Sequence, residues 1–431
     1  MFKTVKDINL SGKRVLLRTD YNVPLVDGKI ADDYRIRQSL PTIEYILKNG
    51  PASLIIIAHL GRPKGKPDKA LSLSPVAKRL AQLLGRPVGF APQCTGDAVK
   101  ELVAKLSSDG ILLLENLRFR AGEETNDPDF AKAIVAATSA EIFVQDGFGV
   151  VHRAHASTQA ITKILPSVGG LLLEKEVETI VGVMNKPARP LVAVVGGAKI
   201  SDKIDVLNKF IELADCVAVT GALANNFLAG QGVRIGKSLI DPDAGAEASE
   251  IWHRAQAEEQ KRPFNFLVPV DVVVSKSLDG RSPTRIVDIA SHSLADIEAY
   301  PKLPKPDSYS VRADELILDI GPISAAEIVG AIKIARTVVW AGTCGVTETK
   351  GIAGGADPFA HGSKTVAEAM IGQSNSHKNK PFSVVGGGDS VRYISSEGWL
   401  DDFNHVSTGG SASLDLMAGK KLPGIEALLD K

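Results

Sequence analysis

The sequence alternates between short apolar runs and longer segments with helical periodicity. In the first part of the chain the apolar runs are typical of strands buried on both faces of a parallel sheet, and they cover residues 15–17, 54–57, 111–114 and 142–144. Two helices have recognisable start signals. Ser74-Pro75 supplies an N-cap and a first-turn proline for one helix, which ends at Gly85. Asp127-Pro128 begins the other helix, which ends near Thr138. This alternation predicts a parallel sheet covered by helices on both faces.

A second half of the same kind follows. A helical run over residues 171–184 stands between glycines and prolines, which predicts a helix that connects two domains. The pattern then predicts strands at 191–195, 217–220, 338–340 and 382–385, and helices at 201–213 and 324–335. The last helix begins with a predicted capping box, Ser324 with Glu327. Residues 279–314 give no clear pattern, and no internal repeat is present, so the fold class is α/β with two halves.

Composition narrows the possible partners and the cell compartment. The chain has 431 residues, and its Lys plus Arg and Asp plus Glu counts are equal at 50 each, so no overall charge favours nucleic acid or a membrane. The three cysteines are far apart and form no disulfide framework, which suits a reducing compartment. The N-terminus has no apolar signal core, and no run approaches the ~20 apolar residues of a membrane span. We therefore expect a cytoplasmic protein with no nucleic-acid and no membrane partner.

The stretch Gly386-Gly387-Gly388-Asp389 links a predicted strand to a helical pattern that continues through Ile394. A turn through glycines leaves backbone N–H groups bare at the start of the helix, where a phosphate can approach them. Asp389 could hold a metal ion bound to the same phosphate. A tight connection without a ligand is the alternative. A second stretch, Gly196-Gly197-Ala198-Lys199, repeats the arrangement earlier in the chain.

Lys199 and Lys203 are four residues apart and are predicted to straddle the start of the helix at 201–213. That spacing places both ammonium groups toward one side, at a helix end that is already positive. The arrangement is unfavourable unless an anion binds there. Two exposed lysines without a ligand remain the alternative.

In the first half, arginines and histidines, with one aspartate and one asparagine, follow successive predicted strands, and the opening helix adds Arg35. Ligands of parallel sheets bind beyond the carboxyl ends of the strands, and arginines bind phosphate and carboxylate groups through two hydrogen bonds at once. The set predicts a small, highly anionic substrate, although any one member alone would be a surface residue. Arg18 and Arg37 do not fit the pattern and are assigned structural or surface roles. The members of the set are Asp20, Asn22, Arg35, His59, Arg62, Arg118, His152, Arg153 and His155.

Residue types and spacing argue against several other functional motifs in this sequence. His152 and His155 lack a third ligand at metal spacing, and Arg153 between them repels a cation. The basic loop at 61–66 has no interleaved aromatic residues to suggest nucleic-acid binding. Residues 232–238 imitate a phosphate-binding loop but are one residue short, and no strong strand precedes them. No GxGxxG motif follows a predicted strand, so the chain lacks a dinucleotide fingerprint.

Taken together, the motifs resemble phosphoglycerate kinase in order and spacing over nearly the whole chain. The resemblance implies two Rossmann-like three-layer domains with parallel sheets, which face each other across a cleft. It implies an N-terminal phosphoglycerate-binding domain at 1–168 completed by the tail at 405–431, a connecting helix at 169–186, and a C-terminal nucleotide-binding domain at 187–404. The matching stretches are 19–25, 33–36, 40–43, 59–63, 115–119, 146–149, 152–155, 196–199, 202–204, 319–322, 386–389 and 407–410.

The resemblance also implies the reaction, which is reversible phosphoryl transfer from 1,3-bisphosphoglycerate to MgADP, giving 3-phosphoglycerate and MgATP, catalysed by a monomer that uses Mg²⁺. By position, the implied phosphoglycerate site is Asp20, Asn22, Arg35, His59, Arg62, Arg118 and Arg153. The implied nucleotide site is Lys199, Lys203, Glu348, Gly386, Gly387, Gly388 and Asp389, with Asp389 on Mg²⁺ and Glu348 on the ribose. The implied catalytic groups around the transferred phosphoryl are Arg35, Lys199, Gly386 and Gly387. Glu176 and Thr408 are the implied hinge residues.

The sequence departs from the family pattern at three places. Ala341 replaces an asparagine, Gly147 replaces an alanine, and Ser411 follows Gly409-Gly410 where a third glycine is usual. Ala341 and the altered tail at Ser411 motivate one alternative, a non-catalytic paralogue that binds phosphorylated ligands, which would bind ligand without making ATP. A second alternative is a two-domain kinase that acts on a different acyl phosphate or carboxylate, which competition with 3-phosphoglycerate would reveal.

Overall fold

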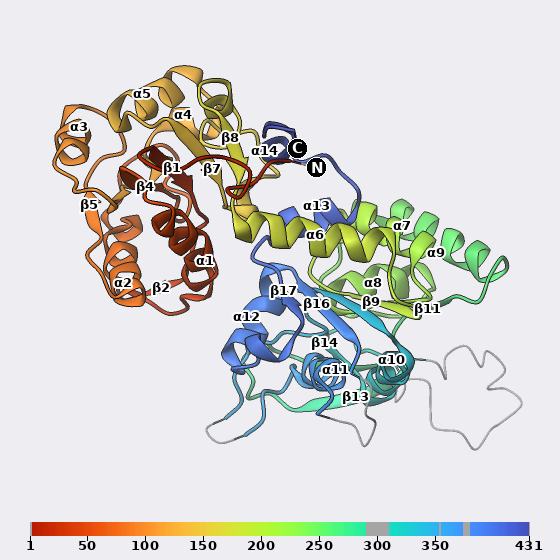
Figure 1. Cartoon of the computed structure of the whole chain (residues 1–431). Coiled ribbons are helices and arrows are strands. Elements are labelled where there is room, and N and C mark those ends of the chain that lie inside the picture. The colour runs from red at the N-terminus through yellow and green to blue at the C-terminus, as the bar shows by residue number, and fades with distance from the viewer. Residues whose placement is uncertain (1, 290–309, 353–354, 374–379, 431) are drawn as a thin grey trace, which may run out of the picture. The chain divides into compact units, whose positions relative to one another are not determined.

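The chain divides into two units by its internal contacts. The computed structural model describes residues 2–289, 310–352, 355–373 and 380–430. The first unit contains Met1–Ile180 and Lys420–Lys431, and the second contains Val181–Gly419 (Figure 1).

The first unit is built on a six-stranded sheet in the order β5-β6-β4-β1-β7-β8, with every neighbouring pair parallel. Its four inner strands confirm the apolar runs predicted from the sequence. The short edge strands β5 and β8 were not predicted. The bounds are β1 Arg14–Arg18, β4 Ser53–Ile57, β5 Gly89–Ala91, β6 Gly110–Leu114, β7 Ile142–Gln145 and β8 Ser167–Gly169.

Helices cover both faces of this sheet, as the alternation predicted (Figure 1). Along β1, Val15 and Leu17 belong to the core that contains α1 and α2, whereas Leu16 belongs to the core that contains α3 and α5. Successive side chains of a strand point to opposite faces, so one apolar strand supplies both cores. The helices are α1 Tyr34–Lys48, α2 Ser74–Leu84, α3 Asp97–Ala104, α4 Ala121–Glu124 and α5 Pro128–Thr138. A short hairpin, β2 Leu25–Val26 with β3 Lys29–Ile30, precedes α1.

Two of the predicted helix boundaries are confirmed in detail and one is wrong by a residue. The Asp127 side chain caps α5 by accepting a hydrogen bond of 2.9 Å from the backbone N–H of Asp129. Gly85 ends α2 in the left-handed conformation that glycine favours. Ser74, however, is the first residue of α2, and the N-cap position is taken by Leu73.

The second unit has its own six-stranded parallel sheet, in the order β11-β10-β9-β15-β16-β17. The chain runs outward from β9 in one direction and from β15 in the other, so the strand order reverses between β9 and β15. In open sheets of this kind the reversal point is where ligands bind. The bounds are β9 Leu191–Val195, β10 Cys216–Val219, β11 Asn265–Leu267, β15 Thr337–Ala341, β16 Phe382–Gly386 and β17 His405–Val406.

Helices of the second unit pack on this sheet and on one another. α7 contacts β9 and β10, α10 contacts β9 and α11, and α12 contacts β16. Within the described ranges, no helix is long and apolar enough to cross a membrane. The helices are α7 Ile204–Leu213, α8 Gly221–Gly230, α9 Gly245–Glu259, α10 Pro322–Ile334, α11 His361–Ile371, α12 Gly388–Ser396 and α13 Ser411–Met417.

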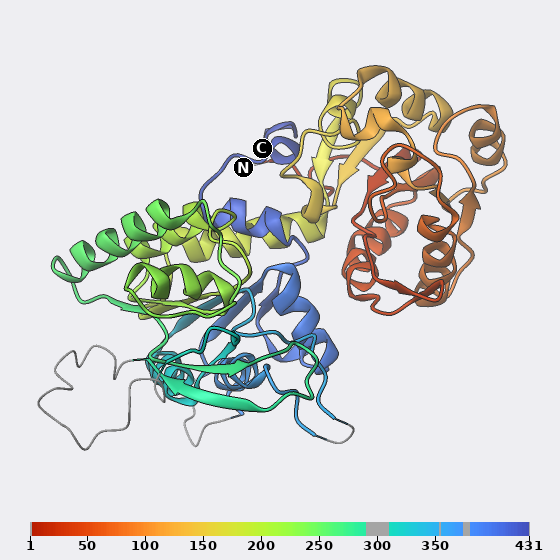
Figure 2. The same ribbon diagram turned by 180° about the vertical axis from the view of Figure 1, so that it is seen from behind.

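A three-stranded antiparallel sheet in the second unit was not predicted. Its order is β13-β12-β14, and it lies beside α10 and α11 (Figure 2). Strand β13 falls in the stretch at 279–314 that gave no clear pattern, and residues 290–309 of that stretch lie outside the described residues. The bounds are β12 Asp271–Ser275, β13 Thr284–Asp288 and β14 Leu316–Ile320.

The predicted connecting helix is α6, Leu171–Asn185, and the division into units falls inside it, between Ile180 and Val181. The division also differs from the expected one near the C-terminus. Strand β17 pairs with β16, so residues up to Gly419 belong to the second unit, and the first unit takes back only Lys420–Lys431 rather than 405–431.

Both ends of the chain belong to the first unit, where they lie side by side in both views (Figures 1 and 2). The backbone N–H of Lys3 donates to the carbonyl of Leu429 over 2.8 Å. Val5 and Leu429 in turn donate to carbonyls of β8, at Gly169 and Ser167, over 2.9 and 3.0 Å. The two termini are therefore fastened to each other and to the edge strand of one sheet.

The predicted capping box at Ser324 and Glu327 is wrong. Helix α10 begins two residues earlier, at Pro322, and Ser324 is buried inside its first turn. The Ser324 hydroxyl donates to the Asp271 carboxylate over 2.6 Å and accepts from the backbone N–H of Val270 over 2.9 Å. The Asp271 carboxylate also accepts from the N–H groups of Ile323 and Ser324, over 3.0 and 2.8 Å, and so satisfies donors at the start of the helix. The cap thus comes from strand β12 and not from the helix itself.

Replacing Ser324 by alanine should lower the free energy of unfolding of the second unit by about 1–2 kcal/mol, because buried donors and acceptors lose their partner. Glu327→Ala is the matched control, since Glu327 is exposed and a surface change of this kind costs less than about 0.5 kcal/mol. Urea unfolding followed by tryptophan fluorescence measures this, because Trp252, Trp340 and Trp399 are all in the second unit. Equal losses of unfolding free energy in the two variants would instead support the predicted capping box of Ser324 and Glu327.

Candidate functional site

In the first unit, β4, β1 and β7 are neighbours, so the residues that follow them meet at one edge of the sheet. Arg35 Nη1 lies 3.1 Å from Asp20 Oδ2 and donates to the carbonyl of Asn22 over 3.1 Å. The Asn22 side chain in turn accepts from the backbone N–H of Gly61 over 2.9 Å, in the loop after β4. The structure therefore brings Asp20, Asn22 and Arg35 together with the loop that carries His59 and Arg62.

Arg118 is held against the same loop. It is 5% exposed, donates to the carbonyl of Gly61 over 2.9 Å, and has Nε 3.3 Å from Glu124 Oε1. Asn116 fixes the start of this short turn, because its side chain accepts from the N–H of Arg118 over 3.1 Å and donates to the carbonyl of Leu60 over 2.7 Å. The loops after β4 and β6 thus form one hydrogen-bonded rim.

His59 lies below the rim on a fully buried arginine. Arg18 Nη2 donates to His59 Nδ1 over 3.3 Å, and because a guanidinium can only donate, the imidazole must be neutral. Burial, together with the positive charge of Arg18, holds the pKa of His59 well below its ordinary value. Arg18 was assigned a structural or surface role from the sequence, and it is structural, since it supports a residue of the predicted set from beneath.

No sequence pattern singles out Glu123, yet Glu123 balances the charge of this cluster. Its carboxylate is fully buried and lies 3.7 Å from Arg18 Nη2 and 3.8 Å from His155 Nδ1. It accepts from the hydroxyl of Ser157 over 2.6 Å and from the Ser157 N–H over 3.1 Å. Burial raises the pKa of Glu123, and the nearby Arg18 opposes that rise. Glu123 therefore links the buried arginine to the loop after β7.

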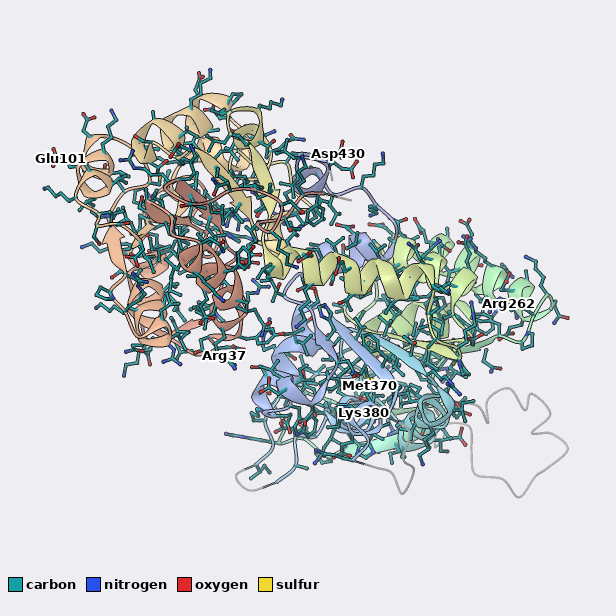
Figure 3. The ribbon with its side chains drawn as sticks, viewed as in Figure 1. Arg37, Glu101, Arg262, Met370, Lys380 and Asp430 are labelled. Carbon is teal, nitrogen blue, oxygen red and sulfur yellow. The ribbon has the colours of Figure 1, made fainter. Side chains whose placement is uncertain are left out.

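The remaining predicted residues of the first unit lie in the loops after β4 and β7. Arg62 and Arg153 are exposed, and Arg153 Nε donates to His152 Nε2 over 3.2 Å. Arg37 is also exposed and pairs with Asp33 at 2.9 Å, in agreement with a surface role (Figure 3). In the part of the chain that the structure describes, no group of three or more His, Cys, Asp or Glu side chains is arranged to hold a metal ion.

His155 should remain neutral far below the ordinary range of histidine. Burial and then the charge of Arg18 lower the pKa of His155 to about 3, so its imidazole should show no protonation step between pH 8 and 4.5 in ¹H–¹⁵N spectra of the folded protein. In the urea-unfolded protein the same imidazole should titrate with a pKa near 6.5. Because the unfolded chain binds this proton first, His155 contributes stability that is complete above pH 6.5 and is lost as the pH falls. A midpoint near 6.5 in the folded protein would contradict this.

In the second unit, β9, β15 and β16 are neighbours, and glycine turns follow all three. The turns after β9 and β15 approach so closely that a Cβ on Gly342, whose φ is +102°, would lie 2.2 Å from the carbonyl oxygen of Gly196. Gly387, with φ +83°, is the N-cap of α12, and Asp389 lies in the first turn of that helix. This confirms the predicted turn from strand into helix at 386–389. The first N–H groups of such a helix have no partner within the helix itself.

The prediction that Lys199 and Lys203 straddle a helix start is wrong. Helix α7 begins at Ile204 with Lys203 as its N-cap, so both lysines precede it. Lys203 folds back over the glycine turn, since a Cβ on Gly197 would lie 2.7 Å from its Nζ. Burial lowers the pKa of Lys203, which the charges of Asp202 and Asp389 oppose. Lys199 is exposed in the same turn.

A cavity of about 270 Å³ opens beside these turns. Its body is largely apolar, while Glu348 and Asp389 also contribute to its lining. Such a surface, apolar with a few polar groups, suits a ligand that has a planar ring joined to a polar portion. A larger cavity of about 690 Å³ in the same unit has none of the predicted residues in its lining. Residues that line the smaller cavity include Gly197, Ala198, Gly221, Asn225, Leu316, Leu318 and Gly345.

The sequence model of the family described as "Phosphoglycerate kinase" matches residues 5–420. The chain belongs to the phosphoglycerate kinase family. It is 44% identical over 427 residues to the phosphoglycerate kinase of Chloroherpeton thalassium, covering 99% of this chain and 98% of that one. It is 43% identical over 436 residues to that of Koribacter versatilis, with 99% of each chain covered.

Solved structures agree with this assignment. The chain matches phosphoglycerate kinase from Coxiella burnetii with a TM-score of 0.77 and 33% identity, and that from Pyrococcus horikoshii with a TM-score of 0.80 and 29% identity. Each match covers 99% of this chain and 98% of the other. The α/β fold with two parallel-sheet units is therefore that of the phosphoglycerate kinases, and the chain is a phosphotransferase of glycolysis.

Proposed function

We propose that this protein transfers a phosphoryl group reversibly from 1,3-bisphosphoglycerate to MgADP, giving 3-phosphoglycerate and MgATP. The observation that carries the proposal is the arrangement at the edge of the first sheet, where Arg35 is held by Asp20 and by the carbonyl of Asn22. A fixed guanidinium beside further basic groups suits a small substrate that carries a carboxylate and a phosphate. Asp20, Asn22, Arg35, His59, Arg62, Arg118 and Arg153 form the proposed phosphoglycerate site.

The second unit supplies the proposed nucleotide site. The apolar cavity would take the base, Glu348 the ribose, and the glycine turn at Gly386, Gly387 and Gly388 the phosphates, with Lys199 and Lys203 nearby. Ala341, which replaces the usual asparagine, is fully buried at the end of β15 and offers no side-chain amide to this site.

The residues present fit a Mg²⁺ ion that is held jointly with phosphate. Asp389 is an exposed carboxylate in the first turn of α12, and the space over the adjacent Gly388 is open. One carboxylate beside an open phosphate position is a donor set that Mg²⁺ favours, because this ion keeps several waters and binds substrate oxygens. When bound, Mg²⁺ would neutralise charge on the phosphate oxygens.

The chemistry requires positioning and charge neutralisation rather than a covalent intermediate. In the ATP-forming direction the nucleophile is already an anionic phosphate oxygen, so no general base is required. Arg35, Lys199 and the N–H groups at Gly386 and Gly387 would stabilise the charge of the transferred group. The two substrates would have to meet in a closed cleft that excludes water, with Glu176 and Thr408 as hinge residues.

A coupled assay tests the proposal. Purified protein with MgATP and 3-phosphoglycerate should consume NADH through a dehydrogenase that reduces the acyl phosphate, and EDTA should abolish the signal. Arg35→Ala should lose turnover, whereas Arg37→Ala, an exposed arginine on the same helix, should retain it. Ligand binding by calorimetry without turnover would favour the non-catalytic paralogue. Turnover with another carboxylate, inhibited by 3-phosphoglycerate, would favour the different kinase.

The proposal includes a cytoplasmic monomer with no nucleic-acid partner. All three cysteines, Cys94, Cys216 and Cys344, are buried free thiols, which suits a reducing compartment. Sedimentation of the purified protein, with and without substrates, tests the monomeric state.

A further inference from the structure

Arg392, on α12, lies between the two acidic residues of the proposed nucleotide site. Its Nη2 is 3.5 Å from Asp389 Oδ1, one turn earlier on the same helix, and its Nη1 is 3.5 Å from Glu348 Oε1, in the segment after β15. Both carboxylates line the cavity of about 270 Å³. One guanidinium thus joins two separate segments of the chain beside that cavity.

The two contacts have different significance. An arginine three residues after an aspartate is a common pair on a helix surface, and alone it would indicate nothing about a ligand. Glu348 belongs to another element, and without Arg392 the two carboxylates would repel each other beside one cavity. Their joint pairing with one cation makes Arg392 part of the electrostatics of this site.

A bound metal and a bound nucleotide respond to this cation in opposite ways. A divalent ion that approaches Asp389 must replace the guanidinium, which stays tethered to α12 and repels the ion. The phosphates of a nucleotide are attracted by the same positive charge. Arg392 should therefore weaken the binding of free metal and strengthen that of free nucleotide.

We propose that Arg392 couples metal binding to nucleotide binding, so that Asp389 takes a divalent ion mainly together with a nucleoside diphosphate or triphosphate. This inference rests on the proposed assignment of Asp389 and Glu348 to the nucleotide site. Arg392 is a positioning residue, since it acts through these two carboxylates. The three side chains are 64%, 55% and 54% exposed, so each effect is limited to about 2- to 5-fold, the range that exposed ion pairs reach.

The test measures the two ligands separately on the full chain. Mn²⁺ without nucleotide is titrated and followed by the EPR signal of the free ion, and ADP with EDTA is titrated by calorimetry. Arg392→Ala should bind Mn²⁺ about 2- to 5-fold more tightly and ADP about 2- to 5-fold more weakly than the wild type. Arg392→Lys should restore both values toward the wild type, and both differences should shrink in high salt.

Two variants show whether the effect is local. Arg254→Ala removes the same charge from an exposed pair with Glu212, outside the lining of the cavity, and should change neither affinity. Adding Asp389→Asn to Arg392→Ala should abolish the gain in Mn²⁺ affinity. Equal Mn²⁺ affinity in wild type and Arg392→Ala, including no measurable binding to either, overturns the proposal, as do shifts of one sign for both ligands.

The failure of this inference is distinguishable from failure of the proposed function. If the wild type turns over and binds ADP but Arg392→Ala leaves both affinities unchanged, only the role of Arg392 is wrong. If the wild type neither binds ADP nor turns over, the nucleotide site itself is wrong.

Discussion

Lys199→Ala should lower kcat by about 100- to 1000-fold, while the KM values for both substrates change much less. The exposed ammonium of Lys199 follows the glycine turn after β9 and is proposed to meet charge that develops on the transferred phosphoryl group. An interaction that is stronger in the transition state than in the ground state appears in kcat rather than in KM. Steady-state kinetics in the coupled assay, with each substrate varied in turn, measures both constants.

Two further variants sharpen this prediction. Lys199→Arg keeps the positive charge and should recover part of the lost kcat, because the guanidinium differs in shape and reach. Lys333→Ala removes an exposed lysine of α10 in the same unit and should leave both constants unchanged. An unchanged kcat in Lys199→Ala, or a loss confined to KM, would reject the catalytic role of Lys199.

Glu123→Ala should lower the free energy of unfolding of the first unit by about 3–5 kcal/mol, because it leaves the buried Arg18 without its carboxylate. The change also removes the acceptor of the Ser157 hydroxyl and N–H, so the loop after β7 loses its attachment. Native-state hydrogen exchange of amides in β1 and β7 reports the first unit separately, which matters because a chain with two units need not unfold in one step.

The charge and the packing of Glu123 can be separated. Glu123→Gln keeps the shape of the side chain and part of its hydrogen bonding but removes the charge. If Glu123→Gln lowers the free energy of unfolding nearly as much as Glu123→Ala does, the effect is due to the charge. Glu101→Ala removes an exposed carboxylate from α3 and should change stability by less than about 0.5 kcal/mol (Figure 3). A loss below 1 kcal/mol in Glu123→Ala would show that Arg18 is not stabilised by this pair.

The sequence predicted the inner strands of both sheets because a parallel strand buried on both faces is a continuous apolar run. At the sheet edges it missed short strands, of which β17 has two residues and β8 has three. Runs of that length have no periodicity of their own, since their pairing is decided by neighbours distant in the chain. The failed capping box at Ser324 has the same cause, because its partner Asp271 comes from another strand.

The candidate site was predictable where single residues follow strands, as with Asp20, His59 and Arg118. Their contacts were not predictable, because strand order decides which loops meet. Glu123 and Arg18 were missed as a pair because a buried ion pair has no local pattern in the sequence. Lys203 was misplaced for a smaller reason, since α7 begins three residues later than its apolar pattern indicates.

The fastening of both chain ends to β8 has a consequence for synthesis on the ribosome. The first unit is interrupted by the whole of the second and takes its last residues from Lys420–Lys431. Every part of the second unit leaves the ribosome before those residues do, so the second unit can complete its fold first although the first unit starts earlier. Until Leu429 has emerged, the N-terminal segment can pair with Gly169, but the carbonyl of Ser167 in β8 and the N–H of Lys3 lack their partner, and this part of the sheet edge is exposed to pairing with other chains.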